Sequence, residues 1–102
     1  MAVDLYPEKM VTIVVSTSLE ERMKRTIRAS EASGFTYFTV RGEGESGPQT
    51  GHLAGDSSTM FLVVLSESKL DGFLSAIKRL KACGHHATVF VGDTQVMNPV
   101  KY

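Results

Sequence analysis

Hydrophobic and β-branched residues gather into four short runs along the chain, separated by polar and charged segments. The runs are Met10–Ser16, Phe35–Arg41, Thr59–Leu65 and Ala87–Val91. Runs of this length and composition, bounded by Gly, Ser and charged residues, are typical of strands in a packed sheet. Between the first two runs, and again between the last two, apolar residues recur three and four positions apart. That spacing predicts an amphipathic helix in each interval.

Each predicted helix carries a start signal and a stop signal. A Ser followed three residues later by an acidic residue is typical of a helix start, and a Gly beyond the last apolar position ends a helix in the left-handed conformation. The signals are Ser18 with Glu21 and Gly34 for the first helix, and Ser68 with Asp71 and Gly84 for the second. The two halves of the chain therefore repeat one plan of strand, capped helix, Gly and strand.

This order of elements predicts an α+β fold. It is a ferredoxin-like βαββαβ sandwich, with two helices on one face of an antiparallel four-stranded sheet. The 102 residues fit a single domain over residues 1–102. Within it, residues 42–58 form a long loop, and residues from about 93 to 102 form a C-terminal tail with room for a short extra strand.

Both faces of the predicted sheet are apolar. On the first strand Val11, Ile13 and Val15 alternate with the equally apolar Val14, and the third strand is apolar at every position from 60 to 65. Two helices cover only one face, and an antiparallel sheet with a wet face should alternate apolar with polar residues. At about 25 cal/mol per Å², burying a few hundred Å² contributes several kcal/mol per subunit. We therefore expect an oligomer in which the uncovered apolar faces of several subunits pack together. The alternative is a subunit whose second face remains an apolar patch exposed to solvent.

Charge and cysteine content narrow the classes of function. Eleven basic residues cancel eleven acidic ones, so the chain lacks the basic excess that nucleic-acid binding usually needs. No apolar run reaches the 18 residues that a membrane-spanning helix needs, and the start of the chain does not have the pattern of a secretory signal. The single cysteine, Cys83, has no second cysteine with which to form a disulfide within the chain. A reduced, cytoplasmic setting fits best. No G-x-S-x-G motif or other catalytic set is present, so we do not expect an enzyme.

Residues 42–47 read GEGESG, which is a literal G-x-G-x-x-G. A dinucleotide-binding site needs a helix opening at the third glycine, and a P-loop needs a following Gly-Lys-Ser/Thr; the polar stretch after Pro48 supplies neither. The glycines instead allow several backbone amides to point at one anion, with Arg41 beside them as a cation. The alternative is a flexible hairpin loop, although a loop this long in a small domain is usually functional or disordered.

The stretch from Gly34 to Gly47, GFTYFTVRGEGESG, resembles the second strand and the base of the T-loop in the PII signalling family. That family shares a Gly-x-Thr start, alternating strand residues and a Gly-x-Gly turn before a long mobile loop. The order of elements matches over about residues 10–92. The resemblance implies a homotrimer that binds adenine nucleotides in clefts between subunits, and a T-loop that engages a membrane transporter or a metabolic enzyme.

The resemblance also implies roles for residues at the base of this loop. Thr36 lies where the family places a residue near the base or ribose. Gly42 and Gly44 lie at the phosphate-facing turn, where Arg41 adds the charge already inferred from its position. Ser46 falls near the position at which nitrogen-sensing members have a glutamine.

The turn after the second helix, Gly84-His85-His86, corresponds to the B-loop of the family. Here the B-loop is shortened and lacks the phosphate-binding lysine. The tail after Val91 lacks the arginines that hold a triphosphate, and the long loop lacks the tyrosine that is uridylylated in nitrogen sensors. The chain is therefore more similar to divergent PII-like branches, including those linked to bicarbonate transport and carboxysomes. These prefer ADP, AMP or cyclic AMP to ATP, and some bind bicarbonate, so we expect a regulatory ligand of this kind and no cofactor.

A second interpretation is a trimeric metal-binding protein like the CutA group. Neighbouring residues on a strand point to opposite faces, so His85 and His86 do not easily share one metal, and a site would need His52 from another subunit. We predict no metal site and interpret these histidines as cleft or surface residues. An acylphosphatase-like enzyme of the same fold is disfavoured, because the only asparagine is Asn98 in the tail.

Overall fold

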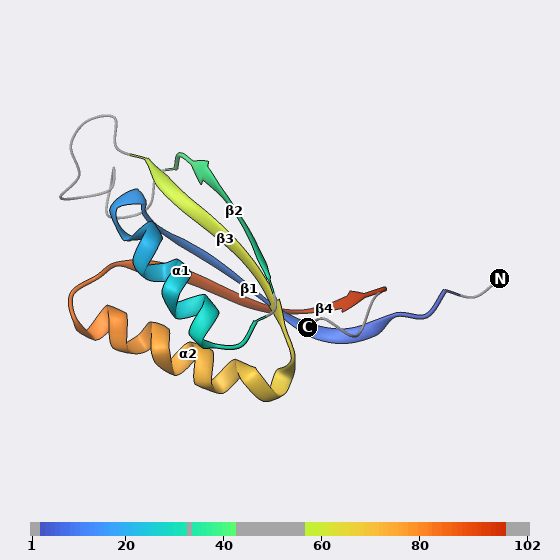
Figure 1. Ribbon diagram of the computed structural model, residues 1–102. Helices are drawn as coiled ribbons and strands as arrows, with labels where there is room; N and C mark the ends of the chain where they lie inside the picture. The colour runs from blue at the N-terminus through green and yellow to red at the C-terminus, as the bar shows by residue number, and fades with distance from the viewer. Residues whose placement is uncertain (1–2, 33, 43–56, 98–102) are drawn as a thin grey trace.

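The computed structural model describes residues 3–32, 34–42 and 57–97 (Figure 1). Two helices lie side by side on one face of a single sheet, which confirms the predicted ferredoxin-like βαββαβ fold of the α+β class. No helix within the described ranges is both long enough and apolar enough to cross a bilayer. The elements in chain order are β1 (Tyr6–Ser16), the 3₁₀ turn η1 (Thr17–Leu19), α1 (Glu20–Ala29), β2 (Phe35–Val40), β3 (Ser58–Leu65), α2 (Glu67–Ala82) and β4 (Ala87–Val96).

The sheet is antiparallel throughout, in the order β2-β3-β1-β4. β1 is central: its Ile13 lies opposite Phe61 of β3 on one side and opposite Val89 of β4 on the other. β2 pairs with β3 alone and places Tyr37 opposite Phe61. The two halves of the chain therefore interleave, and β2 and β4 form the two edges of the sheet.

The hydrophobic core fills the space between the helices and the sheet. Successive side chains of a strand point to opposite faces, so every second residue of β1 and β3 reaches the helices. Apolar positions at helical spacing on α1 and α2 meet them from the other side. The buried hydrophobic residues are Val11, Ile13, Val15, Met23, Ile27, Phe61, Val63, Leu65, Phe73 and Ile77.

The other face of the sheet is apolar and carries no helix, as the sequence predicted. We call it the open face. Phe38 and Phe90 are 43% and 59% exposed on it, which leaves a large aromatic surface in water for one chain alone. The apolar residues of the open face are Met10 and Val14 of β1, Phe38 of β2, Met60, Leu62 and Val64 of β3, and Phe90 of β4.

The helix starts differ from the predicted capping boxes. Ser18 does not cap α1, because the chain tightens into η1 directly after β1 and the amide of Ser18 donates to Oγ of Ser16 at 3.2 Å. Glu21 accepts instead from Nζ of Lys24 at 3.0 Å. α2 begins one residue before the expected Ser68, again without a side-chain cap.

The predicted end of the first helix at Gly34 is wrong. α1 ends at Ala29, and the residue with a left-handed backbone is Glu31, at φ 67°. Nζ of Lys69, from the first turn of α2, donates to the carbonyl oxygen of Glu31 at 3.0 Å. The contact places a cation beyond the C-terminal end of α1, where it suits the negative end of the helix dipole.

The predicted end of the second helix at Gly84 is confirmed. Gly84 has φ 95°, a conformation that favours glycine. Its amide donates to the carbonyl of Lys81 at 3.0 Å, and the amide of His85 donates to that of Leu80 at 3.3 Å. This pair of bonds is a Schellman motif, and it fixes the direction in which the chain enters β4.

β1 and β4 are both longer than their apolar runs. β3 ends at Leu65, opposite Lys9, while β1 and β4 stay paired as far as Tyr6 opposite Val96. The two strands therefore continue beyond the sheet as a two-stranded arm (Figure 1). Lys9 forms an ion pair with Asp93 across this arm. Residues 93–96, expected in the tail, belong to β4.

Candidate functional site

Four strand ends meet at one end of the sheet. Val40 of β2 pairs with Ser58 of β3, which also pairs with Ser16 of β1, and Val15 pairs with Ala87 of β4. The residues that directly follow β2 and directly precede β4 therefore emerge at the same end. These are the segments in which the sequence placed most of its candidate site residues.

The two segments lie at opposite edges of that end. Arg41 and Gly42 follow β2, whereas His85 and His86 precede β4, and three strand spacings separate these edges. At about 4.8 Å per spacing the edges are about 14 Å apart. One subunit therefore supplies two separate half-sites instead of one closed pocket.

Arg41 and Gly42 are both exposed at the β2 edge. Among the described residues, none lies within 4 Å of a Cβ atom added to Gly42. Gly44 and Ser46 lie outside the described residues, as does residue 43 and all of 45–56. Of the turn whose backbone amides were predicted to bind an anion, the structure therefore describes only the first glycine, Gly42.

Thr36 lies at the far end of β2 from Arg41. Phe35 and Tyr37 pack against Phe61 on the helix side, so Thr36 points to the open face, where it is exposed. Five residues of strand separate Thr36 from Arg41, or about 17 Å. The two side chains therefore cannot contact the same phosphate group, which agrees with the different roles that the family resemblance implied for them.

His85 and His86 at the β4 edge have different surroundings. Nε2 of His85 lies 3.2 Å from Nη1 of Arg22 on α1. A guanidinium only donates, so Arg22 is the donor in this contact. His86 is exposed. Of the two histidines, His86 is the one left free to meet a ligand or another subunit.

Hydroxyl groups between the two edges were missed by sequence reasoning. The amide and Oγ1 of Thr17 donate to the carbonyl of Ser57 at 3.2 and 2.7 Å, and the two side-chain hydroxyls lie 3.0 Å apart. These bonds fasten the start of β3 to the end of β1. The signal was available, since the chain reads Ser-Thr-Ser at 16–18 and Ser-Ser-Thr at 57–59, at two strand ends that must meet.

A charged cluster on α1 supports the β2 edge. Nζ of Lys24 lies 4.2 Å from the ring centroid of Tyr37, 3.0 Å from Glu21 and 3.4 Å from Glu20. Hydrogen bonding to Tyr37, and then to Glu21, raises the pKa of Lys24 above its ordinary value. Oγ1 of the buried Thr59 donates to Glu20 at 2.9 Å. The cluster joins α1 to β2 and β3 close to the candidate site.

No group of three or more His, Cys, Asp or Glu side chains within the described ranges is arranged to hold a metal ion. His52, which the metal interpretation required, lies outside those ranges. The described part of the chain therefore gives the metal interpretation no support.

Comparison with known families identifies a single match over nearly the whole chain. The model of the family described as nitrogen regulatory protein P-II matches residues 8–101. None of the curated proteins compared with the chain matches it.

Solved structures agree with this family match. The PII-like nitrogen regulatory protein CPII of Thiomonas intermedia K12, bound to ADP, AMP and bicarbonate, is 27% identical, with a TM-score of 0.85 over 98% of this chain and 97% of that one. The same protein bound to ADP and bicarbonate is 28% identical, with a TM-score of 0.85 over 98% of each chain. A PII-like signalling protein of Thermus thermophilus is 27% identical, with a TM-score of 0.78 over 97% and 98% of the two chains.

Proposed function

Because the chain belongs to the nitrogen regulatory P-II family, we propose that it is a regulator that binds an adenine nucleotide between its subunits. Members of the family are trimers and act as regulators without catalysing a reaction, so membership implies both properties here. The open face is the surface that such a trimer buries.

One observation carries the proposal: apart from Thr36, the described candidate groups sit at the same end of the sheet but at its two opposite edges. Around a closed three-fold ring, the edges of neighbouring sheets come together at each interface. Arg41 and Gly42 at the β2 edge, and His86 at the β4 edge, then line clefts that no single subunit forms by itself.

The ligand that we propose is ADP or AMP, with cyclic AMP as a further candidate and bicarbonate beside the nucleotide. CPII has been solved with ADP, AMP and bicarbonate. Among the described candidate residues, Arg41 is the only permanent cation. A mono- or diphosphate is easier to neutralise with so few cations than a triphosphate, because each buried phosphate charge needs a partner.

Regulation would pass through residues 42–58, the segment that the family resemblance assigns to the T-loop. A nucleotide shifts such a segment only by binding one of its conformations more tightly than the others. We propose that the favoured conformation engages a membrane transporter or a metabolic enzyme on the cytoplasmic side. Residues 43–56 of this segment lie outside the described ranges.

Isothermal titration tests the proposed ligand. Separate titrations with ADP, AMP, cyclic AMP and ATP, each with and without bicarbonate, should give saturable heat for ADP or AMP at one site per subunit. ATP should bind more weakly than ADP. The absence of heat from all four nucleotides would contradict the proposal, and tighter binding of ATP would contradict the preference for shorter phosphate chains.

The variant Arg41→Gln tests the half-site at the β2 edge. Hydrogen bonds to charged groups contribute about 1.5–3 kcal/mol, so the variant should bind ADP roughly tenfold or more weakly in the same titration. Arg28→Gln is the matched control, because the guanidinium of Arg28 lies 5.7 Å from the ring centroid of Phe35, which is at the opposite end of β2 from Arg41. Equal loss of affinity in both variants would show that Arg41 has no specific role.

A further inference from the structure

A groove between the two helices lies on the face of the molecule away from the open face. Arg22 and Arg25 of α1 and Arg79 of α2 line one end of it, and Glu31 and Lys69 line the other. The start of α1 thus lies beside the end of α2, so the two helices run antiparallel. We propose that this helix groove binds an acidic segment of a partner protein.

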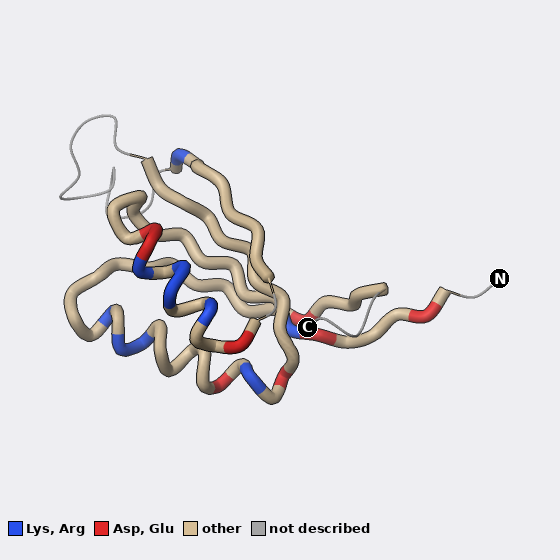
Figure 2. The backbone as a smooth tube through the Cα atoms, in the orientation of Figure 1, with Lys and Arg blue, Asp and Glu red and all other residues tan. Residues whose placement is uncertain are grey.

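The charge of the helix groove favours an anionic occupant. Three arginines and Lys69 line it, against the single carboxylate of Glu31. Lys69 already donates to the Glu31 carbonyl at 3.0 Å, whereas none of the three arginines has a carboxylate within ion-pair distance in the described part of the chain. Figure 2 shows basic residues along α1 and towards the two ends of α2, with acidic ones at the ends of α1 and near the start of α2.

The shape of the helix groove favours a chain segment over a single ion. Its lining includes the small residues Ala29, Gly72 and Ala76, and its volume is about 750 Å³. From Arg22 to Ala29 it follows α1 for seven residue steps, a length of about 10 Å at 1.5 Å per residue. An extended peptide rises about 3.3 Å per residue, so about three residues fit along this stretch.

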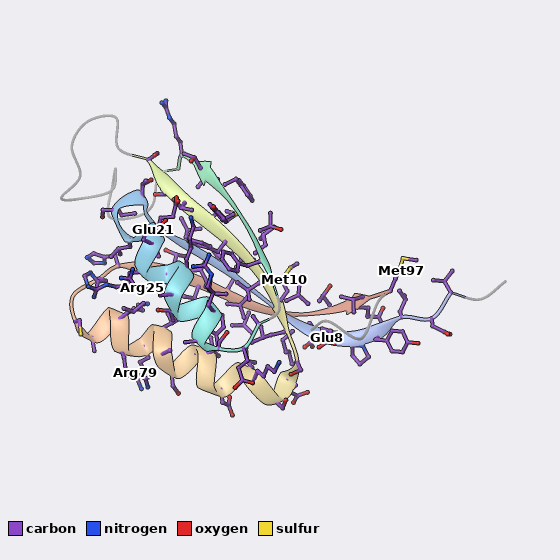
Figure 3. The ribbon with its side chains drawn as sticks, in the orientation of Figure 1. Glu8, Met10, Glu21, Arg25, Arg79 and Met97 are labelled. Carbon is purple, nitrogen blue, oxygen red and sulfur yellow. The ribbon has the colours of Figure 1, made fainter. Side chains whose placement is uncertain are left out.

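The arginines sit where carboxylates of such a segment would reach them. Arg25 and Arg79 come from different helices at the same end of the groove, as their labels in Figure 3 show. Both are exposed, so neither is held in the core. A guanidinium binds a carboxylate through two parallel hydrogen bonds, which favours Asp and Glu side chains as its partners.

The family trimer leaves this surface available. In the trimer proposed above, the three subunits meet through the open face, whereas α1 and α2 cover the opposite face of the sheet (Figure 1). The helix groove therefore faces outward from the assembly, and its arginine end adjoins the β4 edge, where Arg22 contacts His85.

Fluorescence anisotropy of a fluorescein-labelled hexaglutamate peptide tests the proposal on the full chain. Saturable binding is expected, and the double variant Arg25→Gln/Arg79→Gln should weaken it at least tenfold. Arg22 is left unchanged because it also contacts His85. The matched control is Lys78→Gln/Lys81→Gln, which removes the same charge from another side of α2, where these lysines line a separate hollow with Leu74, Ile77 and Val89. The control should bind the peptide within about twofold of the wild type, and a hexaglutamine peptide should not bind.

Three outcomes would overturn the proposal. The first is no binding of the acidic peptide, and the second is equal weakening in both double variants, which would mark a net-charge effect. The third is arginine-dependent binding to vesicles of phosphatidylcholine and phosphatidylserine without binding of the peptide, which would identify a membrane surface as the ligand. Far-UV circular dichroism and ADP titration of the same variants report folding and the proposed nucleotide site separately, so the failure of one proposal is distinguishable from that of the other.

Discussion

Two glycines, one within α2 and one just beyond its end, are subject to different backbone constraints. Gly72 lies inside the helix, where a Cβ would meet nothing within 4 Å, so Gly72→Ala should raise the free energy of unfolding by about 1 kcal/mol. Gly84 has φ 95°, so Gly84→Ala should lower that free energy by about 1 kcal/mol. Urea denaturation at a fixed protein concentration measures both changes. Shifts of the same sign in the two variants would contradict the assignment of Gly84 as the left-handed end of the helix.

The free energy of unfolding depends on pH through the carboxylate of Glu21. Hydrogen bonding to Lys24 lowers the pKa of Glu21 below its ordinary value of 4.5. The folded state therefore binds this proton more weakly than the unfolded state. The ionised Glu21 carboxylate therefore contributes to the free energy of unfolding above pH 4.5. This contribution is lost as the pH falls through the lower pKa of the folded state.

The variant Glu21→Gln should remove this contribution. Its urea midpoint should lie below that of the wild type at neutral pH, and the difference should shrink as the pH falls below 4.5. Asp71→Asn is a control, since Asp71 is exposed on α2 and makes no ion pair in the described part of the chain. A difference for Glu21→Gln that grows toward acid pH would contradict the sign of the shift.

At the scale of elements, strand and helix identity could be predicted from the sequence, but most of their ends could not, and the end of α2 at Gly84 is the exception. The apolar period identifies which residues face the core, whereas a helix end depends on contacts made after the elements pack. Ser18 has the pattern of a cap, yet the chain leaves β1 through a 3₁₀ turn because Thr17 binds Ser57 from across the sheet. The outer half of β4 was missed because residues 92–95, Gly-Asp-Thr-Gln, carry no apolar signal and are held by pairing with β1.

Neighbouring residues of β3 test the assignment of its two faces. Val63 is fully buried against the helices, so Val63→Asp should place an unpaired charge in the core and prevent stable folding. Leu62 is on the open face, so Leu62→Asp should leave the subunit core intact and oppose association instead.

Circular dichroism and sedimentation velocity over a series of concentrations separate these effects. Leu62→Asp should need higher concentrations than the wild type to assemble. Unchanged association of this variant would contradict burial of the open face in the trimer. Native-like stability of Val63→Asp would contradict the assignment of that side as the core.

At the scale of the whole molecule, the sequence predicted the fold, the apolar second face and the family, because all three depend on patterns that extend over many residues. The candidate site could be predicted only as two short segments. Their separation across the sheet follows from strand order, which the sequence implied through the split βαβ plan. The helix groove could not be foreseen, because Arg25 and Arg79 are far apart in the sequence and become neighbours only when the helices pack.

The central claim is that an adenine nucleotide binds to an assembly of three chains and not to one. Sedimentation velocity in the presence of ADP, followed at the absorption maximum of adenine, tests it in a single experiment, because the chain contains no tryptophan and absorbs little there. We predict that ADP sediments with a species of three chains. ADP that remains unbound, or that sediments with a single chain, would contradict the account.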